Sequence, residues 1–483
     1  MKKLIIIISV ALFFSVEIMA QNDIDALRYS MISFGGTARY NSMAGAFGAV
    51  GADFSAISTN PAGLGNYRRN EFTFTPSIYT SATNATYNGV VANDNKYNFN
   101  IGNLGMVYAF KTKNNEEEKG WKSVNFAFGL NRNNNFHKRV LIEGNNTQSS
   151  LMDLYLNAAQ GKTYGDLDPF STQLAFNTYL LDTLSETNYF SNVPNGDLFQ
   201  RKYMETKGAM QEMVFALGAN YNHKLYIGAT FGFPYIKFNE ITSYEEIDEK
   251  DTSAVFDRFI LNEDLETTAS GFNFKLGIVY VPLDLEKIKI KMGGAVHTPT
   301  FYDMHDEWMK NMVAYYDNGS SFSGDSPNGS FDYKLTTPMK AIGSIAIQIP
   351  QLGTISADYE FLDYAESRLR SKTEKYFDEN NLIKQKYRKT NNLRIGAEAL
   401  VGLFSLRCGY ALYNSPFKSG LNNAERTSVT AGLGIMDKSY FLDFAYVYSK
   451  WNEDYYLYND VNISPAFLKT TSHNFLVTLG FKF

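Results

Sequence analysis

The final eleven residues, His473 to Phe483, alternate between two kinds of side chain along one predicted strand. An apolar row occupies one face and a mixed row the other: Phe475, Val477, Leu479, Phe481 and Phe483 against Leu476, Thr478, Gly480 and Lys482. Since successive side chains of a strand point to opposite faces, this pattern fits a barrel wall between lipid and a wet lumen. A sandwich strand of a soluble protein shows the same pattern, so this segment alone leaves both folds open.

The N-terminus carries the features of a secretory signal peptide. Lys2 and Lys3 precede an apolar run from Leu4 to Val16, and a short stretch then ends at Ala20. The run is too short for a membrane-spanning helix, and the lysine pair supplies the positive region that precedes such a run. We therefore expect export with cleavage near Ala20, and residues 1–20 form the first of three predicted segments.

The composition of the remaining chain favours an outer-membrane barrel. No later apolar stretch approaches 18 residues, yet aromatic residues make up 15% of the chain, with 33 Tyr and 37 Phe. Barrels reconcile these facts because they hide hydrophobicity in alternation and gather aromatic residues at both lipid interfaces. The net charge of −5 provides no basic surface for nucleic acid. Cys408 is the single cysteine, which excludes an intramolecular disulfide and a cysteine metal site.

Alternating segments bounded by turn residues predict an all-β, transmembrane antiparallel barrel of about fourteen strands within residues 71–483. Most segments reach the roughly 9 to 11 residues that cross a bilayer at a tilt. They are 71–80, 96–110, 121–131, 208–221, 224–239, 268–281, 287–297, 333–349, 352–364, 391–400, 403–413, 425–436, 439–449 and 470–483.

The connections between these segments alternate in length. The tight ones include 222–223, 350–351, 401–402 and 437–438, whereas 132–207, 240–267, 298–332 and 365–390 are long and polar. Short periplasmic turns against long outer loops are typical of a transmembrane barrel. An even number of strands also returns Phe483 to the periplasmic side.

Charged residues recur on the face opposite the apolar rows and predict a charged belt inside the lumen. The belt comprises Asp358, Glu360, Arg394, Glu398, Arg407, Asp443 and Lys482, with Lys275, Lys289 and Lys291 adding positive charge elsewhere. The belt could act in selectivity or gating. The alternative, which we favour, is a set of wall charges that pair with one another, because a buried charge needs a partner.

Residues 21–70 differ from the barrel wall and predict a small plug, or hatch, inside the lumen. The segment is dense in small residues and contains the turn Asn60-Pro61-Ala62-Gly63-Leu64. A fourteen-stranded wall encloses more space than its own side chains fill. Within the hatch, Asn60, Pro61 and Ala62 are expected to fix its geometry. Four apolar side chains are expected to line a ligand channel or to pack on the inner wall: Phe34, Met43, Phe47 and Phe54.

Four short motifs of the hatch resemble those of FadL-type outer-membrane transporters for long-chain fatty acids, a family that includes toluene and xylene channels. The motifs are 36–39 (GTAR), 43–46 (MAGA), 53–56 (DFSA) and 60–64 (NPAGL). The resemblance implies a fourteen-stranded barrel plugged by an N-terminal hatch, with ligand leaving sideways through a wall opening beside a kinked strand. It also implies that the terminal Phe483 is read by the barrel assembly machinery.

The outward phase of the segment 96–110 slips by one residue, which predicts a kink. Tyr97, Phe99 and Ile101 share one phase, and Leu104 begins the other, with the slip around Gly102-Asn103. A one-residue slip must be absorbed by a bulge or bend. The segment 121–131, with Gly129 facing inward, is the competing position for the kink.

The sequence lacks recognisable catalytic motifs, such as a nucleophile elbow or a His-Glu-x-x-His pair. His297 and His305 flank Asp303 in a predicted outer loop, where a solvated polar loop is a better interpretation than a metal site. We expect neither an enzyme nor a cofactor. The leading hypothesis is a passive outer-membrane channel of a Gram-negative cell for hydrophobic small molecules, long-chain fatty acids by default. The alternatives are a general porin, a surface receptor that binds haem through His297 and His305, and an outer-membrane lipase.

Overall fold

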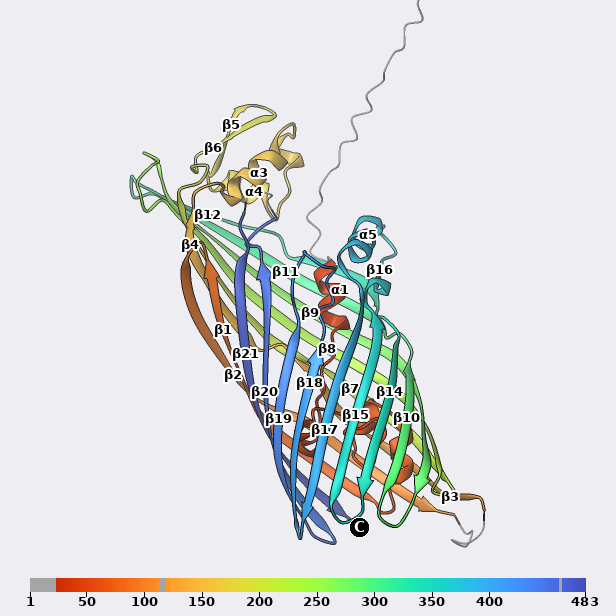
Figure 1. Cartoon of the computed structure of the whole chain (residues 1–483). Coiled ribbons are helices and arrows are strands. Elements are labelled where there is room, and N and C mark those ends of the chain that lie inside the picture. Colours follow the sequence, from red (N-terminus) through yellow and green to blue (C-terminus); the bar gives the residue numbers. More distant parts are fainter. Residues whose placement is uncertain (1–22, 113–118, 460–462) are drawn as a thin grey trace, which may run out of the picture.

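A computed structural model describes residues 23–112, 119–459 and 463–483 and shows a closed barrel of fourteen antiparallel strands, as predicted (Figure 1). The predicted signal peptide lies outside the described residues. No helix among them is long and apolar enough to cross a membrane. The wall strands are β1 (Glu71–Tyr87), β2 (Val90–Lys111), β3 (Trp121–Asn135), β7 (Leu198–Tyr221), β8 (Leu225–Ile247), β9 (Phe256–Asp284), β10 (Lys289–His297), β14 (Lys340–Ile349), β15 (Gly353–Asp363), β17 (Lys389–Val401), β18 (Phe404–Tyr413), β19 (Arg426–Met436), β20 (Tyr440–Tyr455) and β21 (Ala466–Lys482).

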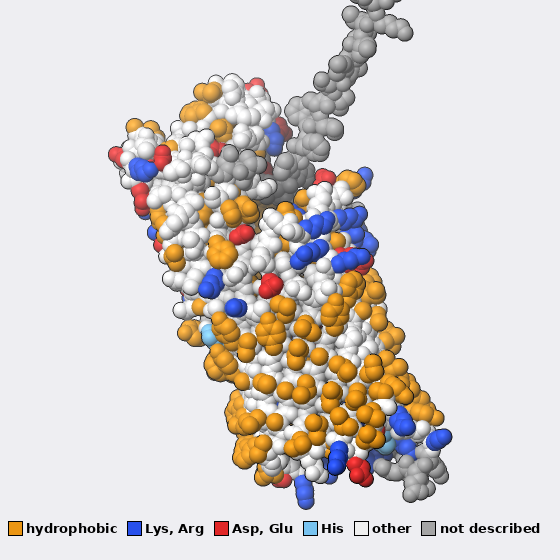
Figure 2. Space-filling view, viewed as in Figure 1, with side chains coloured by type: hydrophobic (Ala, Val, Ile, Leu, Met, Phe, Trp, Pro, Cys, Tyr) orange, Lys and Arg blue, Asp and Glu red, His pale blue; other side chains and the backbone are white. Residues whose placement is uncertain are grey.

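The first and last strands close the barrel. β1 pairs with β21 from Glu71 opposite Lys482 to Thr86 opposite Phe467. The C-terminus lies at the end with the short turns, opposite the larger loops (Figure 1). On β21, Phe475, Leu479 and Phe481 are exposed on the outer surface. Together with equivalent side chains of the other strands they form the continuous apolar band in Figure 2.

Several strands extend further than predicted, and the extensions lie toward the large loops. β10 and β14 are continued there by β11 (Phe301–Tyr316) and β13 (Gly329–Thr336), which are joined through the short strand β12 (Ser321–Asp325). Two interruptions separate the continuing strands, at residues 298–300 and 337–339. The prediction of one uninterrupted strand over 333–349 is therefore wrong. Pro299 and Pro338, which lack the N–H that a ladder requires, lie within the interruptions.

A folded lid covers one side of the barrel mouth (Figure 1). It contains β4 (Lys138–Asn146), α3 (Leu151–Ala159), η3 (Tyr164–Asp166), α4 (Thr172–Asn177) and the hairpin of β5 (Leu181–Ser185) and β6 (Asn188–Ser191). Its apolar core includes Met152, Leu174 and Phe256. Buried Glu246 of β8 holds the start of α3, accepting hydrogen bonds from Ser150 Oγ (2.5 Å) and Leu151 N–H (2.9 Å).

The remaining elements flank or fill the lumen. The hatch contains α1 (Asp23–Ser30), α2 (Ala38–Ser42), η1 (Ser55–Ser58) and η2 (Pro61–Asn66), all within the barrel (Figure 1). At the mouth, opposite the lid, lie η4 (Tyr364–Glu366), β16 (Arg368–Arg370) and α5 (Phe377–Lys386). The hatch thus lies between two mouth structures above and the short turns below.

Candidate functional site

The turn at Asn60, Pro61 and Ala62 fixes the hatch to the inner wall. The Asn60 side chain accepts a hydrogen bond from the Ala62 N–H at 3.1 Å, and its amide donates to the carbonyls of Gly48 at 2.6 Å and Ile278 at 3.2 Å. Pro61 occupies the first turn of η2. An N–H at this position has no partner within a helix, so the proline loses no hydrogen bond. One side chain therefore caps η2, joins two hatch segments and contacts strand β9.

The four hatch side chains named as channel lining all contact other protein groups. Met43, Phe47 and Phe54 are fully buried. Phe34 is half-buried and stacks on Tyr413 of β18, with ring centroids 6.5 Å apart. In the structure described here these side chains pack the hatch against the wall, and any role in lining a channel requires the hatch to move.

An ion-pair network joins the hatch to the wall. Arg407 Nε lies 2.7 Å from Glu398 Oε1, and Arg407 Nη1 lies 2.5 Å from Asp443 Oδ1. Arg39 of α2 binds both oxygens of the same Glu398, at 3.1 and 2.9 Å. The wall side chains of this network are almost completely buried. A bidentate arginine–carboxylate pair in such a setting is strong and geometrically specific.

The other half of the charge belt lies on β15 and β17. Arg394 Nη2 is 3.6 Å from Asp358 and 3.9 Å from Glu360, and Asp358 also accepts a hydrogen bond from the hatch N–H of Gly48. Asn392 donates to Glu360 at 2.8 Å. The belt carboxylates therefore all have partners, and the geometry matches the interpretation as paired wall charges.

The additional lysines named from the sequence also have partners. Lys275 forms a buried pair with Glu212 at 2.5 Å, and Lys291 donates to the hatch carbonyl of Val50 at 3.3 Å. Two pairs lie near the short turns, Lys289 with Asp284 at 2.8 Å and Lys482 with Glu71 at 3.9 Å. The sequence provided no signal for these partners, because they lie on other strands or on the hatch.

Above the belt, the upper lumen is apolar and filled by α1. Aromatic and methionine side chains from many strands surround the helix, including Phe136, Phe238, Tyr302, Met304, Tyr333 and Tyr364. Tyr29 of α1 packs edge-on against Phe238 at 6.1 Å. A barrel lumen is ordinarily polar, whereas the side chains around α1 form a buried apolar cluster.

A small polar cavity of about 60 Å³ lies between the hatch and the wall. Its lining includes Ser33 and Thr59 of the hatch, the cationic side chains of Lys340 and Arg394, and the carboxylate of Glu360. Arg394 is 5% exposed, and its Nε and Nη2 have no hydrogen-bond partner among the described residues, although its charge is paired with Asp358 and Glu360.

The backbone ladder between β2 and β3 ends partway up the wall, and β4 lies beside β1 and β2 above that point. Their ladder runs from Lys111 opposite Ser123 to Asn103 opposite Asn131 and ends there in the described chain. Above this point β2 pairs with β1 alone, and β4 pairs with β7. We call the unpaired edge of β2 over 90–102, with the facing residues 132–135 of β3, the wall gap. Backbone groups at such an edge lack a strand partner, which a membrane barrel ordinarily avoids.

Bulges on both strands produce the wall gap. Thr75 of β1 faces Asn103, whereas Pro76 faces Ile101, so Gly102 is the extra residue, as the predicted slip required. β3 has its own register shift between Arg132 and Asn134.

Gly129, the competing position for the kink, is regularly paired with Gly105 and Val214. The location of the β2 slip is therefore confirmed. The bulge on β3 lies beyond the predicted segment.

Polar side chains and the hatch line the wall gap. Asn98 of β2 contacts His137 at 3.1 Å and accepts from Asn135 at 3.3 Å. The hatch passes directly inside, where the Ser33 N–H donates to the Asn133 carbonyl at 3.2 Å. Ser33 and Asn133 also line the polar cavity. The cavity and the wall gap are thus adjacent.

The pairing of His297 and His305 in one outer loop is wrong. His297 ends β10, is buried, and its Nε2 lies 2.9 Å from the hatch carbonyl of Thr59. His305 lies on β11, where it is exposed and contacts Asp332 at 2.7 Å. Strands β11 to β13 occupy the predicted loop, so the two histidines named in the haem-binding alternative are not in one loop.

The fold and these features define a class: a fourteen-stranded barrel plugged by its N-terminal segment, with an interrupted ladder between β2 and β3. Comparison of structures identifies known barrels of similar fold. A FadL homologue of Pseudomonas aeruginosa has a TM-score of 0.57 and 11% identity, over 94% of this chain and 100% of that one. The Pseudomonas putida toluene transporter TodX has a TM-score of 0.54 and 12% identity, over 93% and 99%.

The Ralstonia pickettii toluene transporter TbuX matches with a TM-score of 0.52 and 15% identity, over 93% of this chain and 99% of that chain. No family model and no curated protein matches the sequence. The predicted resemblance of fold to FadL-type transporters is confirmed by these structures. At such low identity the comparison establishes the fold of this chain.

Proposed function

We propose that this protein takes up hydrophobic small molecules passively across the outer membrane, with long-chain fatty acids as the first substrates to test. Its structural neighbours include toluene transporters and a FadL homologue. Export would follow signal-peptide cleavage near Ala20, and the barrel assembly machinery would insert the chain. Outer-membrane lipid would surround the apolar band.

The wall gap is the observation that carries this proposal. An apolar ligand that leaves sideways enters the membrane directly and avoids the aqueous periplasm, where its transfer is unfavourable. The apolar cluster around α1 provides a matching environment at the mouth of the barrel. A route from this cluster past the hatch to the wall gap needs a movement of α1 and of residues 31–36.

The polar cavity favours an amphipathic acid over a plain hydrocarbon. Lys340 and Arg394 lie in its wall, and two guanidinium nitrogens there lack hydrogen-bond partners among the described residues. A carboxylate is the ligand group that best satisfies a guanidinium. Toluene has no such group, so we expect fatty acids to be bound more tightly than monoaromatic hydrocarbons.

A general porin is the weaker alternative, because the hatch and its ion pairs occupy the lumen. The deciding experiment compares entry of labelled oleate, toluene and a polar sugar into cells with and without the protein. Protein-dependent oleate entry supports the proposal. Unchanged oleate entry with reduced sugar entry on deletion of the protein would establish the porin instead.

The exit route is tested by closing the wall gap. Asn98→Cys and Asn135→Cys, with Cys408→Ser to remove the native thiol, place two thiols across it, and a bis-maleimide then bridges them. We expect oleate entry to fall at least tenfold. The matched control bridges Asn84→Cys and Asn93→Cys, which already face one another in the β1–β2 ladder. Undiminished entry through the bridged gap would refute the sideways exit.

A further inference from the structure

The outer surface of the barrel carries an apolar groove of about 570 Å³ on strands β9, β10, β14 and β15. Gly294 and Gly343 face each other across β10 and β14 and form its floor. A Cβ at Gly343 would meet no atom within 4 Å, so the wall is indented there. Tyr359 and Phe361 of β15, both exposed, form one side of the groove.

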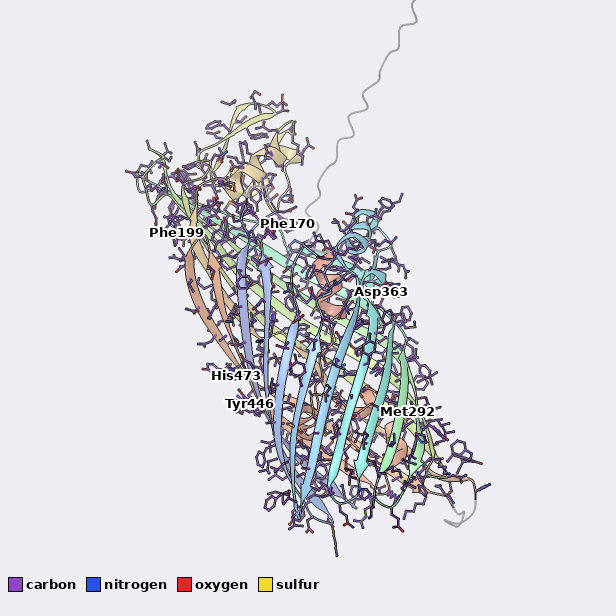
Figure 3. All side chains as sticks on the ribbon, in the orientation of Figure 1. Phe170, Phe199, Met292, Asp363, Tyr446 and His473 are labelled. Carbon is purple, nitrogen blue, oxygen red and sulfur yellow. The ribbon has the colours of Figure 1, made fainter. Side chains whose placement is uncertain are left out.

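Strand register shows how the groove is oriented. One row across the wall joins Leu276, Val296, Ala341 and Phe361, and the next row toward the short turns joins Ile278, Gly294, Gly343 and Tyr359. Asp363 and Met292, labelled in Figure 3, mark the upper and lower ends of this face. The groove therefore lies within the apolar band, close to its upper border.

A cluster of basic side chains lies directly above the groove. Phe361 faces Asn391, and two residues further Asp363 faces Lys389 of β17. Lys389 is on the same outward face as Leu393, which pairs with Tyr359 of the groove. At roughly 3.3 Å per residue, Lys389 is about 13 Å from the floor of the groove along the strand. Figure 2 shows blue side chains gathered here, at the base of α5 and above the orange band.

Backbone contacts hold the basic cluster together. Lys418 of the β18–β19 loop donates through Nζ to the Lys384 carbonyl at 2.6 Å, and the Arg388 N–H donates to the Pro416 carbonyl at 2.9 Å. Lys384, Arg388, Lys389 and Lys418 are exposed. None forms an ion pair with a carboxylate of the described residues, whereas their neighbour Lys386 pairs with Asp23 at 3.0 Å. The cluster therefore presents four cationic side chains without a direct ion pair, with Asp363 opposite Lys389 as the neighbouring carboxylate.

We infer that this face binds one phosphorylated lipid of the outer leaflet, with an acyl chain in the groove and a phosphate on the basic cluster. A lipid of the outer leaflet has a charged headgroup above an apolar acyl chain. The cationic side chains and the apolar groove beneath them are arranged in the same order along the membrane normal. Phosphate is multiply charged and accepts hydrogen bonds from several lysine and arginine donors. The inference uses the orientation of the barrel in the membrane and is independent of what the barrel transports.

The test measures binding to the full-length mature protein, purified in detergent, by native mass spectrometry. Bisphosphorylated lipid A is the probe, and the same lipid without phosphates and inorganic phosphate are the comparators. We expect lipid A to bind, the dephosphorylated lipid to bind at least tenfold more weakly, and inorganic phosphate at millimolar concentration to compete poorly. Equal binding of the two lipids, or full displacement by inorganic phosphate, would overturn the inference.

Variants separate the two halves of the site. Lys384→Gln with Lys389→Gln is expected to weaken lipid A binding about 25-fold, since each surface cation contributes about a fivefold factor. Gly343→Phe fills the groove and is expected to weaken binding about 15-fold, as about two methylene groups lose contact. The matched control, Lys450→Gln with Lys469→Gln, removes exposed lysines of β20 and β21.

The inference fails if either test variant binds lipid A with the same affinity as the control. Heat-dependent gel mobility verifies that each barrel is folded, and Gly343→Phe adds an apolar group to a lipid-facing wall, so folding should persist. Oleate entry through the Gly343→Phe variant is expected to equal that of the parent protein. Failure of lipid binding and failure of the proposed transport are therefore separate results.

Discussion

Replacement of Arg39 by methionine should loosen the hatch without unfolding the barrel. Arg39 makes two hydrogen bonds to Glu398, at 3.1 and 2.9 Å, and a third to the hatch carbonyl of Ala52 at 3.1 Å. The Arg39 guanidinium carbon also lies 5.2 Å from the centroid of the Phe47 ring, and methionine keeps an apolar side chain of similar length beside that ring. The substitution thus removes the charge and its bonds and leaves the packing largely in place.

The size of the destabilisation depends on the ion-pair partner that Glu398 retains in the Arg39→Met variant. Breaking a buried ion pair costs about 3 to 5 kcal/mol, because the remaining charge stays buried. Glu398 retains Arg407 at 2.7 Å, and the Arg39 side chain is 23% exposed, so we take the lower end. About 3 kcal/mol corresponds to a roughly hundredfold larger opening constant for the hatch. The strands are unaffected, because none of their ladder bonds changes.

Hydrogen exchange followed by mass spectrometry measures this opening in residues 38–60. We expect hatch amides to exchange about a hundredfold faster in Arg39→Met, with wall amides unchanged. Arg69→Met is the control, since the Arg69 guanidinium bonds only to the exposed carbonyl of Lys438. Adding Glu398→Gln to Arg39→Met should restore much of the protection, because it removes the uncompensated charge. Hatch exchange within twofold of the parent would refute the reasoning.

Three further predictions concern the lid, the hatch seat and the C-terminus. Glu246→Gln turns an amide toward hydrogen-bond donors and should destabilise the lid by about 2 kcal/mol, measured as faster proteolysis within 147–197 against a Glu245→Gln control. Gly409→Leu would place Cβ 2.6 Å from a hatch backbone carbon and should raise ion conductance in planar bilayers, whereas Cys408→Leu on the outward face should not. Deletion of Phe483 should lower the fraction of heat-modifiable barrel in outer membranes, and an unchanged fraction would contradict its role in assembly.

The strands could be predicted from sequence because every wall side chain faces either lipid or lumen. The alternation of β21 and the slip at Gly102 are local patterns, and both are present in the structure. Strand ends were predicted less well, since β1 continues to Tyr87 beyond the apolar band, where both faces are polar or covered by the lid. The prolines themselves were the sequence signal for the interruptions at Pro299 and Pro338. The regular alternation of outward side chains on either side obscured that signal.

The site depended on pairings that no local pattern reveals. The belt residues Glu398 and Arg407 were predicted to face inward, but their partner Arg39 lies 359 positions from Glu398 in the chain. The end of the β2–β3 ladder at Asn103 is likewise a property of two strands together. His297 was predicted as the last residue of the strand 287–297, where the structure also places it, but its contact with the hatch could not be anticipated from its neighbours.

The hatch makes its decisive contacts with strands that are synthesised last. The Ala38 N–H bonds to Thr478 at 2.7 Å, Thr430 donates to the Ser42 carbonyl, and Arg39 binds Glu398. These contacts can form only after nearly the whole chain has been exported, whereas the contacts of Asn60 with β9 involve an earlier part of the chain. The same C-terminal strand that bonds to Ala38 also closes the barrel by pairing with β1. Closure of the wall and the last contacts of the hatch therefore depend on the same residues.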